Sequence, residues 1–140
     1  MEKVKTLTNT TQIMVRFCEV DSLGIVWHGH YLKYLEDGRE AFGVQYGLGY
    51  IDIYNNGLVI PIVKVEVDFK RPLKYRDKVT IETTYQDCEA AKLIFSYTLK
   101  DLNGQVVGTA TTIQVFLEKG VLCLYTPEFI NQWKTKNLVK

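Results

Sequence analysis

The sequence carries little net charge, few cysteines and no long apolar run. Its formal net charge is only +1, whereas nucleic-acid and membrane-surface proteins usually present a strongly basic face. The three cysteines, Cys18, Cys88 and Cys123, are odd in number, far apart and outside any CxxC spacing. This argues against a disulfide framework or a structural zinc site, and we expect buried thiols. The expected partner is therefore a small molecule, with no nucleic acid and no membrane insertion.

The first ten residues, MEKVKTLTNT, hold basic groups without the apolar stretch that a signal peptide or a membrane anchor needs. We therefore expect a cytoplasmic protein. No repeat, low-complexity tract or linker interrupts the chain, and 140 residues suit one globular core. The expectation is a single domain over residues 1–140.

Two periodicities divide the first half of the chain. Residues 12–20 alternate apolar and polar side chains, which predicts a half-buried strand. From His30 to Tyr46 the apolar residues recur at helical spacing, which predicts one long helix. Gly38 within it costs about 1 kcal/mol relative to alanine, so we expect another backbone to approach closely there. The Gly- and Asn-rich stretch 47–57 is interpreted as a loop.

Period two returns in the second half and predicts four strands, over residues 63–69, 79–85, 93–99 and 107–117. The last of them shows one alternating row: Val107, Thr109, Thr111, Ile113, Val115 and Leu117. Asn103-Gly104 predicts a type I′ hairpin, because both residues tolerate positive φ. A short strand near 121–125 and a helix after Pro127 complete the pattern.

This order of elements predicts an α+β fold, with an antiparallel β-sheet wrapped around one long central α-helix. One helix cannot cover a sheet of this length. A second subunit is therefore expected to cover the remaining apolar surface and the sheet edge. We predict a homodimer, or a tetramer built from dimers.

The loop between the first strand and the helix, residues 20–31, is apolar and has one acidic side chain, so we expect it to be buried. Asp21 could simply cap a turn by accepting backbone N–H groups. Alternatively, unpaired N–H groups from about His28 onward point out of the positive end of the helix. There they could hold an oxyanion opposite the Asp21 carboxylate, an arrangement that suits acyl transfer.

Residues 21–31, DSLGIVWHGHY, and the helix that follows, with YLEDGREAF, resemble the signature of hotdog thioesterases related to 4-hydroxybenzoyl-CoA thioesterase. The bacterial acyl-CoA thioesterases associated with the Tol-Pal system share it. The likeness continues through residues 60–83 to the paired C-terminal strands. The resemblance implies the hotdog fold and the hydrolysis of acyl-CoA to a free acid and CoA, without a cofactor.

The resemblance also implies roles for individual residues. Asp21 would be the nucleophile or the general base, and the backbone N–H of His28 would polarise the thioester carbonyl. The segment Ile60-Pro61-Ile62 would line the path of the pantetheine arm. The remaining substrate-binding residues implied are Gly29, Tyr31 and Lys92.

The sequence departs from these relatives where they hold the nucleotide phosphates with a basic cluster ahead of the fourth strand. Here residues 89–92 read EAAK, and only Lys92 is cationic. An alternative basic patch comes from Lys70, Arg71, Lys74, Arg76 and Lys78, although charges in a solvated turn are the plainer interpretation.

Rival interpretations rest on weaker patterns. His28 and His30 have no further partner at metal-ligand spacing, and a Cys18–His28 nucleophile pair has no third group to orient it. A hotdog hydratase would place its histidine five residues after the aspartate, whereas His28 lies seven after Asp21. A silent acyl-thioester binding protein on the same fold also stays open.

The acyl group is not fixed by these motifs. Four tyrosines could border an aromatic acyl pocket, but tyrosines at helical spacing are more often core residues with one wet end. They are Tyr31, Tyr34, Tyr46 and Tyr50. The sequence thus favours an aliphatic acyl-CoA.

Overall fold

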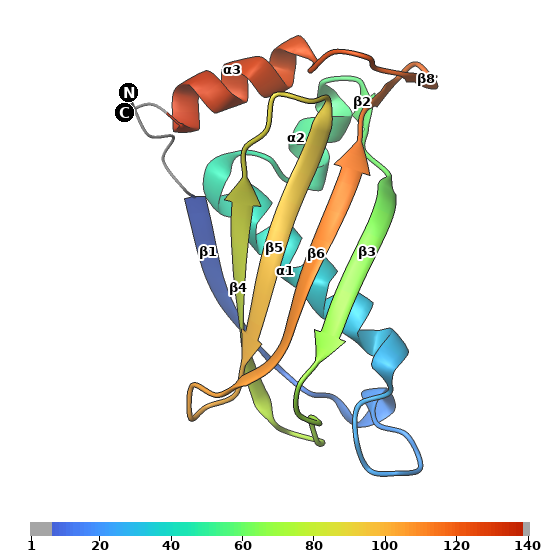
Figure 1. The fold of residues 1–140 in the computed structure, drawn as a ribbon, viewed down its shortest axis with the longest axis vertical. Helices are drawn as coiled ribbons and strands as arrows, with labels where there is room; N and C mark the ends of the chain where they lie inside the picture. Colours follow the sequence, from blue (N-terminus) through green and yellow to red (C-terminus); the bar gives the residue numbers. More distant parts are fainter. Residues whose placement is uncertain (1–6, 139–140) are drawn as a thin grey trace.

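The computed structural model describes residues 7–138. Its largest parts are one long helix and five strands: α1 (Tyr31–Tyr46), β1 (Leu7–Met14), β3 (Ile62–Phe69), β4 (Lys78–Gln86), β5 (Lys92–Lys100) and β6 (Val106–Val115). The strands form one antiparallel sheet in the order β1-β4-β5-β6-β3, and α1 lies across one face of it (Figure 1). The predicted α+β hotdog architecture is confirmed.

The smaller elements gather at one end of this sheet (Figure 1). They are the helices α2 (Tyr50–Asn55) and α3 (Glu128–Asn137) and a second sheet of β2 (Leu58–Val59), β7 (Leu117–Glu118) and β8 (Val121–Leu122). The stretch 47–57, interpreted as a loop, thus contains α2. Asp52 explains part of this, because its Oδ2 accepts the backbone N–H of Gly49 (2.9 Å) at the helix start.

The core lies between α1 and the sheet. Tyr34, Leu35 and Phe42 on α1 are fully buried, as are the inward residues of β4 and β5. Gly38 is the point of closest approach, because a Cβ there would lie 2.5 Å from Thr83 Oγ1 and 2.7 Å from Ile81 Cγ2. The expected close contact therefore exists, but it is made with side chains of β4 and not with another backbone.

The first strand differs from the prediction. β1 ends at Met14, and Phe17–Glu19 form a 3₁₀ turn instead of continuing to residue 20. Glu19 occupies a polar position of the predicted alternation, yet it is only 4% exposed. Its carboxylate accepts the backbone N–H of Arg16 (2.8 Å), which turns the chain away from the sheet.

β6 is out of phase with the predicted row. Lys100 pairs with Val106 and Leu99 with Gly108, so Val107 is an extra residue in a bulge. Beyond the bulge the buried residues are Ala110, Thr112, Gln114 and Phe116. The predicted row beyond Val107 is only half-buried. The hydrophobic pattern placed the wrong set of residues on one face, because threonine fits both faces of a sheet.

The hairpin between β5 and β6 is not a type I′ turn. Gly104 has a φ of 79°, whereas Asn103 is not among the described residues with positive φ. Asp101 fixes the turn, since its Oδ1 accepts the N–H groups of Asn103 (2.9 Å) and Gln105 (3.0 Å). The sequence indicated the hairpin correctly and its turn type wrongly.

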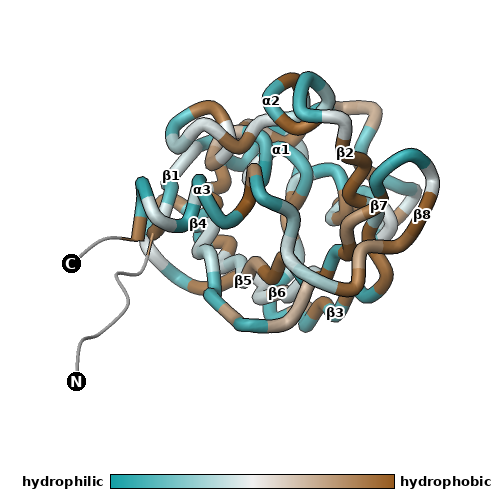
Figure 2. Tube along the Cα trace, turned by 90° about the horizontal axis from the view of Figure 1, so that it is seen from above, coloured by the Kyte–Doolittle hydropathy of each residue, from teal (hydrophilic) through white to brown (hydrophobic). Residues whose placement is uncertain are grey.

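Apolar surface remains uncovered along β3 and beside the small sheet. Val63 and Phe69 on β3 are exposed, Phe69 by 52%. Seen from above, apolar residues also gather at β2 and β8 (Figure 2), where Val59, Val121 and Leu122 are exposed. Within residues 7–138 no helix is long and apolar enough to span a membrane.

Candidate active site

The Asp21 loop is a narrow hairpin of its own. Val20 and Val26 form an antiparallel bridge, and the N–H of Asp21 donates to the carbonyl of Ile25 (2.9 Å). The loop is not buried as expected: the side chain of Leu23 is 79% exposed and that of Trp27 is 48% exposed. Within residues 7–138 only part of the loop is covered: Val26 is 4% exposed, whereas Leu23 and Trp27 present apolar surface.

The Asp21 carboxylate has one engaged and one free oxygen. Its Oδ1 accepts the N–H of Leu23 (2.8 Å), which is the turn-capping geometry that the sequence left open. Its Oδ2 has no hydrogen-bond or ion-pair partner in the described part of the chain. Capping thus occupies one side of the carboxylate and leaves the other available for chemistry.

Two backbone N–H groups are free at the start of the long helix. His28–His30 form a 3₁₀ turn directly before α1, in which the N–H groups of His30 and Tyr31 are satisfied by Trp27 and His28. The N–H groups of His28 and Gly29 find no acceptor within residues 7–138. They carry the partial positive charge of a helix start, the kind of donor that stabilises an oxyanion.

Gly29 lies against the Trp27 ring, so a side chain at this position would displace the indole. A Cβ there would lie 2.1 Å from Cζ3 of the Trp27 ring, so the indole packs directly on the glycine backbone. The same ring lies 4.9 Å from the His28 imidazole and 5.5 Å from that of His30, between centroids. Trp27 therefore holds the turn that carries the free N–H groups.

Asp21 and His28 line one cavity of about 380 Å³, and Trp27 and Gly29 are not part of its lining. Asp21, His28 and Tyr31 contribute to its wall, together with Leu23, Ile25, Val26, Phe69, Lys70, Arg71 and Pro72. The cavity brings an acidic side chain and the helix start together. It also adds two members of the alternative basic patch, Lys70 and Arg71.

Glu19 links the Asp21 loop to α1. Its carboxylate accepts the Tyr34 hydroxyl (2.8 Å) and pairs with Lys33 Nζ (3.0 Å), and its carbonyl accepts the N–H of Trp27 (3.0 Å). Burial disfavours the charged carboxylate, but the hydrogen bonds from Arg16 N–H, Lys33 and Tyr34 prevail and lower the pKa of Glu19. Sequence reasoning missed this residue, because no local pattern links Glu19 to Tyr34.

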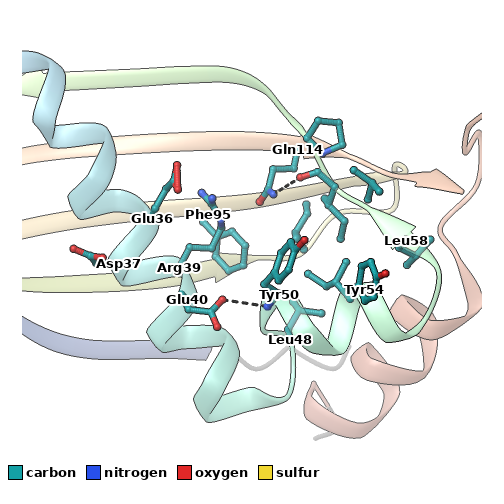
Figure 3. Close-up of a pocket in the computed structure, with 15 residues that line it drawn as sticks. Glu36, Asp37, Arg39, Glu40, Leu48, Tyr50, Tyr54, Leu58, Phe95 and Gln114 are labelled. Carbon is teal, nitrogen blue, oxygen red and sulfur yellow. Dashed lines mark hydrogen bonds between the residues drawn. The ribbon is translucent and has the colours of Figure 1, made fainter. Parts of the chain in front are cut away.

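A second cavity, of about 570 Å³, lies beside the small elements α2 and β2, and Figure 3 shows the residues that line it. It lies between α1, α2 and the sheet, and its lining includes Ile60 and Pro61. Lys92 starts β5 at the same end, since it pairs with Val115, whose N–H donates to Pro61 (3.1 Å). Within one chain the predicted site residues thus form two groups: Asp21, His28, Gly29 and Tyr31 at one end, and Ile60, Pro61, Ile62 and Lys92 at the other.

The remaining candidates have plain structural surroundings. Cys18 is exposed, which corrects the expectation of buried thiols, and Cys88 and Cys123 are half-buried. Among residues 7–138 no three His, Cys, Asp or Glu side chains gather as metal ligands would. Of the four tyrosines, Tyr46 donates to the carbonyl of Thr8 (2.8 Å) and Tyr50 lines the second cavity.

Comparison with known proteins shows the family of the chain. The sequence profile of the Thioesterase-like superfamily matches residues 15–128. YneP of Bacillus subtilis, named as a candidate acyl-CoA thioesterase, is 31% identical over 77% of this chain and 78% of its own. A 1,4-dihydroxy-2-naphthoyl-CoA hydrolase of Thermosynechococcus vestitus is 26% identical over 76% of this chain and 74% of its own.

Solved structures share the fold. A DHNA-CoA thioesterase from Staphylococcus aureus superimposes with a TM-score of 0.82 at 22% identity, covering 92% of this chain and 89% of that one. An aspartate-to-asparagine mutant of 4-hydroxybenzoyl-CoA thioesterase, complexed with 4-hydroxybenzoyl-CoA, gives 0.77 at 24% identity, covering 90% and 97%. The chain belongs to the Thioesterase-like superfamily and is a thioester hydrolase with the hotdog fold.

Proposed function

We propose that the chain hydrolyses acyl-CoA thioesters to the free acid and CoA. One observation carries this proposal: Asp21, whose carboxylate has a free oxygen, and His28, whose backbone N–H is unpaired in the described part of the chain, line the same cavity. A thioester carbonyl placed between them meets a carboxylate on one side and oxyanion donors on the other. A thioester is more electrophilic than an ester, so this pair suffices without a Ser-His-Asp triad, and the sequence has no GxSxG motif.

Two reaction courses fit this arrangement, and both remain open. Asp21 can attack the carbonyl carbon and expel the CoA thiolate, which leaves a mixed anhydride that water hydrolyses. Alternatively, Asp21 takes a proton from a water molecule as that water attacks, and the proton passes to the departing thiolate. In both courses the N–H of His28 stabilises the negative charge that develops on the carbonyl oxygen.

The proposal includes a homodimer joined along β3. This strand is an edge of the sheet, and its apolar residues Val63 and Phe69 are exposed in the single chain. Pairing β3 with a second copy around a two-fold axis continues the sheet and covers that surface. The apolar residues exposed at the small sheet of β2, β7 and β8 offer a second surface, through which two such dimers can form a tetramer.

This pairing explains why the predicted residues fall at two ends of one chain. Strands related by a two-fold axis run antiparallel, so Ile62 at the start of β3 comes to lie opposite Phe69 of the partner subunit. Phe69 borders the Asp21 cavity, and Ile60 and Pro61 border the other cavity. The pantetheine arm then passes between Ile60–Ile62 of one subunit and the catalytic cavity of its partner, with Lys92 at the same end.

Two relatives support CoA thioesters as the substrate class, because their names specify acyl-CoA and 1,4-dihydroxy-2-naphthoyl-CoA. CoA thioesters are cytoplasmic metabolites, so the proposal places the enzyme in the cytoplasm. Lys70 and Arg71, which border the catalytic cavity, supply positive charge for the CoA phosphates.

The test replaces Asp21 by asparagine, which keeps the capping oxygen but cannot act as a nucleophile or a base. We expect thiol release from a panel of acyl-CoAs to fall about 10²- to 10⁴-fold. Asp101→Asn is the matched control, because Asp101 caps the β5–β6 hairpin in the same manner, far from the cavity in sequence. It should retain full activity.

The outcomes separate catalysis from capping. If Asp21→Asn stays within about tenfold of the parent, the barrier has changed by less than about 1.4 kcal/mol, too little for an essential group. Asp21 would then be only a loop cap. If neither the parent nor the control releases thiol from any acyl-CoA, hydrolysis of acyl-CoA itself is the wrong proposal.

A further inference from the structure

The second cavity combines an apolar floor with polar walls. Leu48, Leu58, Leu93 and Phe95 are buried beneath it. Its walls carry Arg39 and the carboxylates of Glu36, Asp37 and Glu40 from α1, and Gln114 from β6 (Figure 3). Its volume, about 570 Å³, lies within the range of small-molecule sites.

Gln114 is the unusual group in this wall. The residue is 5% exposed, and its Nε2 donates to the carbonyl of Ile60 (2.7 Å). This bond fixes the orientation of the amide, because the reverse assignment would set two oxygens against each other. Oε1 is thereby turned away from Ile60, toward the cavity side where Arg39 and Phe95 lie (Figure 3), and it has no partner among the described residues.

Arg39 shares the cavity with this orphan acceptor. Its guanidinium has one weak contact, with the Tyr97 hydroxyl at 3.5 Å, and no carboxylate within salt-bridge distance in the described part of the chain. Three carboxylates nevertheless line the same cavity, so its net charge is negative and an anionic group is disfavoured. The wall thus suits a neutral group, to which Gln114 Oε1, unpartnered among the described residues, offers an acceptor and Arg39 a donor.

We infer that Gln114 is a specificity-determining residue, whose Oε1 accepts a hydrogen bond from a hydroxyl on the acyl group held in this cavity. This inference rests on the proposed function: in the proposed dimer the Ile60–Ile62 end of one subunit adjoins the Asp21 cavity of its partner, and the inference takes the second cavity as the site that the acyl group enters from there. A hydroxyl satisfies the site well because it can donate to Gln114 Oε1 and accept from another group of the wall. A purely apolar acyl group leaves the buried acceptor unpaired, which is costly.

The experiment measures binding of thioether analogues, which cannot be hydrolysed. Hydroxyphenacyl-CoA is compared with phenacyl-CoA, and hydroxyhexyl-CoA with hexyl-CoA, each hydroxyl at the end far from sulfur. We expect at least one hydroxylated analogue to bind the parent about tenfold more tightly than its match. In Gln114→Met, which keeps length and removes the amide, the two members should bind within about twofold of each other.

Thr83→Val is the matched control. Thr83 Oγ1 is a second buried oxygen without a partner in the described residues, but it does not line the cavity. The preference for hydroxylated analogues should therefore persist in this variant. Thermal melts of both variants show whether the fold is intact.

The inference is overturned if no hydroxylated analogue binds the parent better than its match, as when a trapped water satisfies Oε1 permanently. It is equally overturned if Gln114→Met still binds the hydroxylated analogues more tightly than their matches. If Gln114→Met fails to fold, the comparison of the paired analogues on the parent protein alone decides whether the inference holds. Thiol release from the corresponding acyl-CoAs is measured in parallel. Preferential binding without hydrolysis would contradict the proposed function alone, and hydrolysis without preference would contradict this inference alone.

Discussion

The two cavities differ in how they are built. The Asp21 cavity is formed by a loop and a helix start, and backbone groups supply its N–H donors. The second cavity, which contains Gln114, is formed by two helices and the sheet, and its polar groups are side chains on regular elements. Backbone donors treat every thioester alike, whereas side chains on a helix or strand can change without disturbing the fold. Our proposals therefore assign the general reaction to the Asp21 cavity and selection of the acyl group to the second cavity.

The largest expected effect tests whether the two cavities act together across subunits. Asp21→Asn and Ile60→Asp should each be nearly inactive alone. When co-expressed, half of the dimers are mixed, and each mixed dimer has one intact composite site. Activity should therefore recover to roughly one quarter of the parent value, measured as thiol release.

Sedimentation of each variant is the control, since both must form dimers for the comparison to hold. A mixture no more active than its components, with mixed dimers present, would mean that each chain carries its own complete site. A parent that sediments as a monomer at micromolar concentration would exclude the shared interface altogether.

The next expected effect concerns only the Asp21 cavity. His28→Pro removes a backbone N–H and should lower turnover about 10²- to 10³-fold, whereas His28→Ala keeps this donor and should stay within about tenfold of the parent. Steady-state rates of both variants check this, with melting curves to show that the turn survives proline. Equal losses in two folded variants would assign the chemistry to the imidazole instead of the backbone.

The smallest effect concerns Glu19, which links the Asp21 loop to α1. Glu19→Gln weakens the bonds to Lys33 and Tyr34 and should cost about 1–3 kcal/mol at neutral pH, a fall in melting temperature of roughly 5 °C. The fold lowers the pKa of Glu19 from its usual value of 4.5, so its contribution is complete above that value and is lost as the pH falls through the folded pKa.

Melting curves of parent and Glu19→Gln should therefore converge as the medium is acidified below about pH 4.5. Glu66→Gln is the control, because the Glu66 carboxylate is exposed and pairs only with Lys64 on the surface. A gap between parent and Glu19→Gln that persists unchanged in acid would show that Glu19 acts through its shape and not its charge.

Much of the fold was predictable from local patterns. The long helix, expected from His30 to Tyr46, spans Tyr31–Tyr46, and the strands expected over 63–69, 79–85 and 93–99 are present. Each of these segments repeats one period over at least seven residues. The first strand failed because Glu19 is a buried acid that looks like a surface residue in a polar alternation.

The Asp21 cavity was more predictable than the second one. Asp21 and His28 lie seven residues apart, so one loop and the helix start bring them together. Gln114 and Ile60 are joined by a hydrogen bond across 54 residues, and no local period reveals such a pair. The prediction that the Asp21 loop is buried was wrong for a single chain. An apolar composition does not show whether the same chain or another molecule covers a loop.

The bulge in β6 separates the hairpin from the second cavity in register. Val107 is one residue more than the ladder with β5 requires, so its loss would leave the pairs Leu99–Gly108 and Leu93–Gln114 as they are. A one-residue deletion between Gly108 and Gln114, with the pairing at Gly108 kept, would instead turn Val115 inward in place of Gln114. The acyl selectivity proposed for this cavity is therefore insensitive to chain length at the hairpin and sensitive to it within the strand.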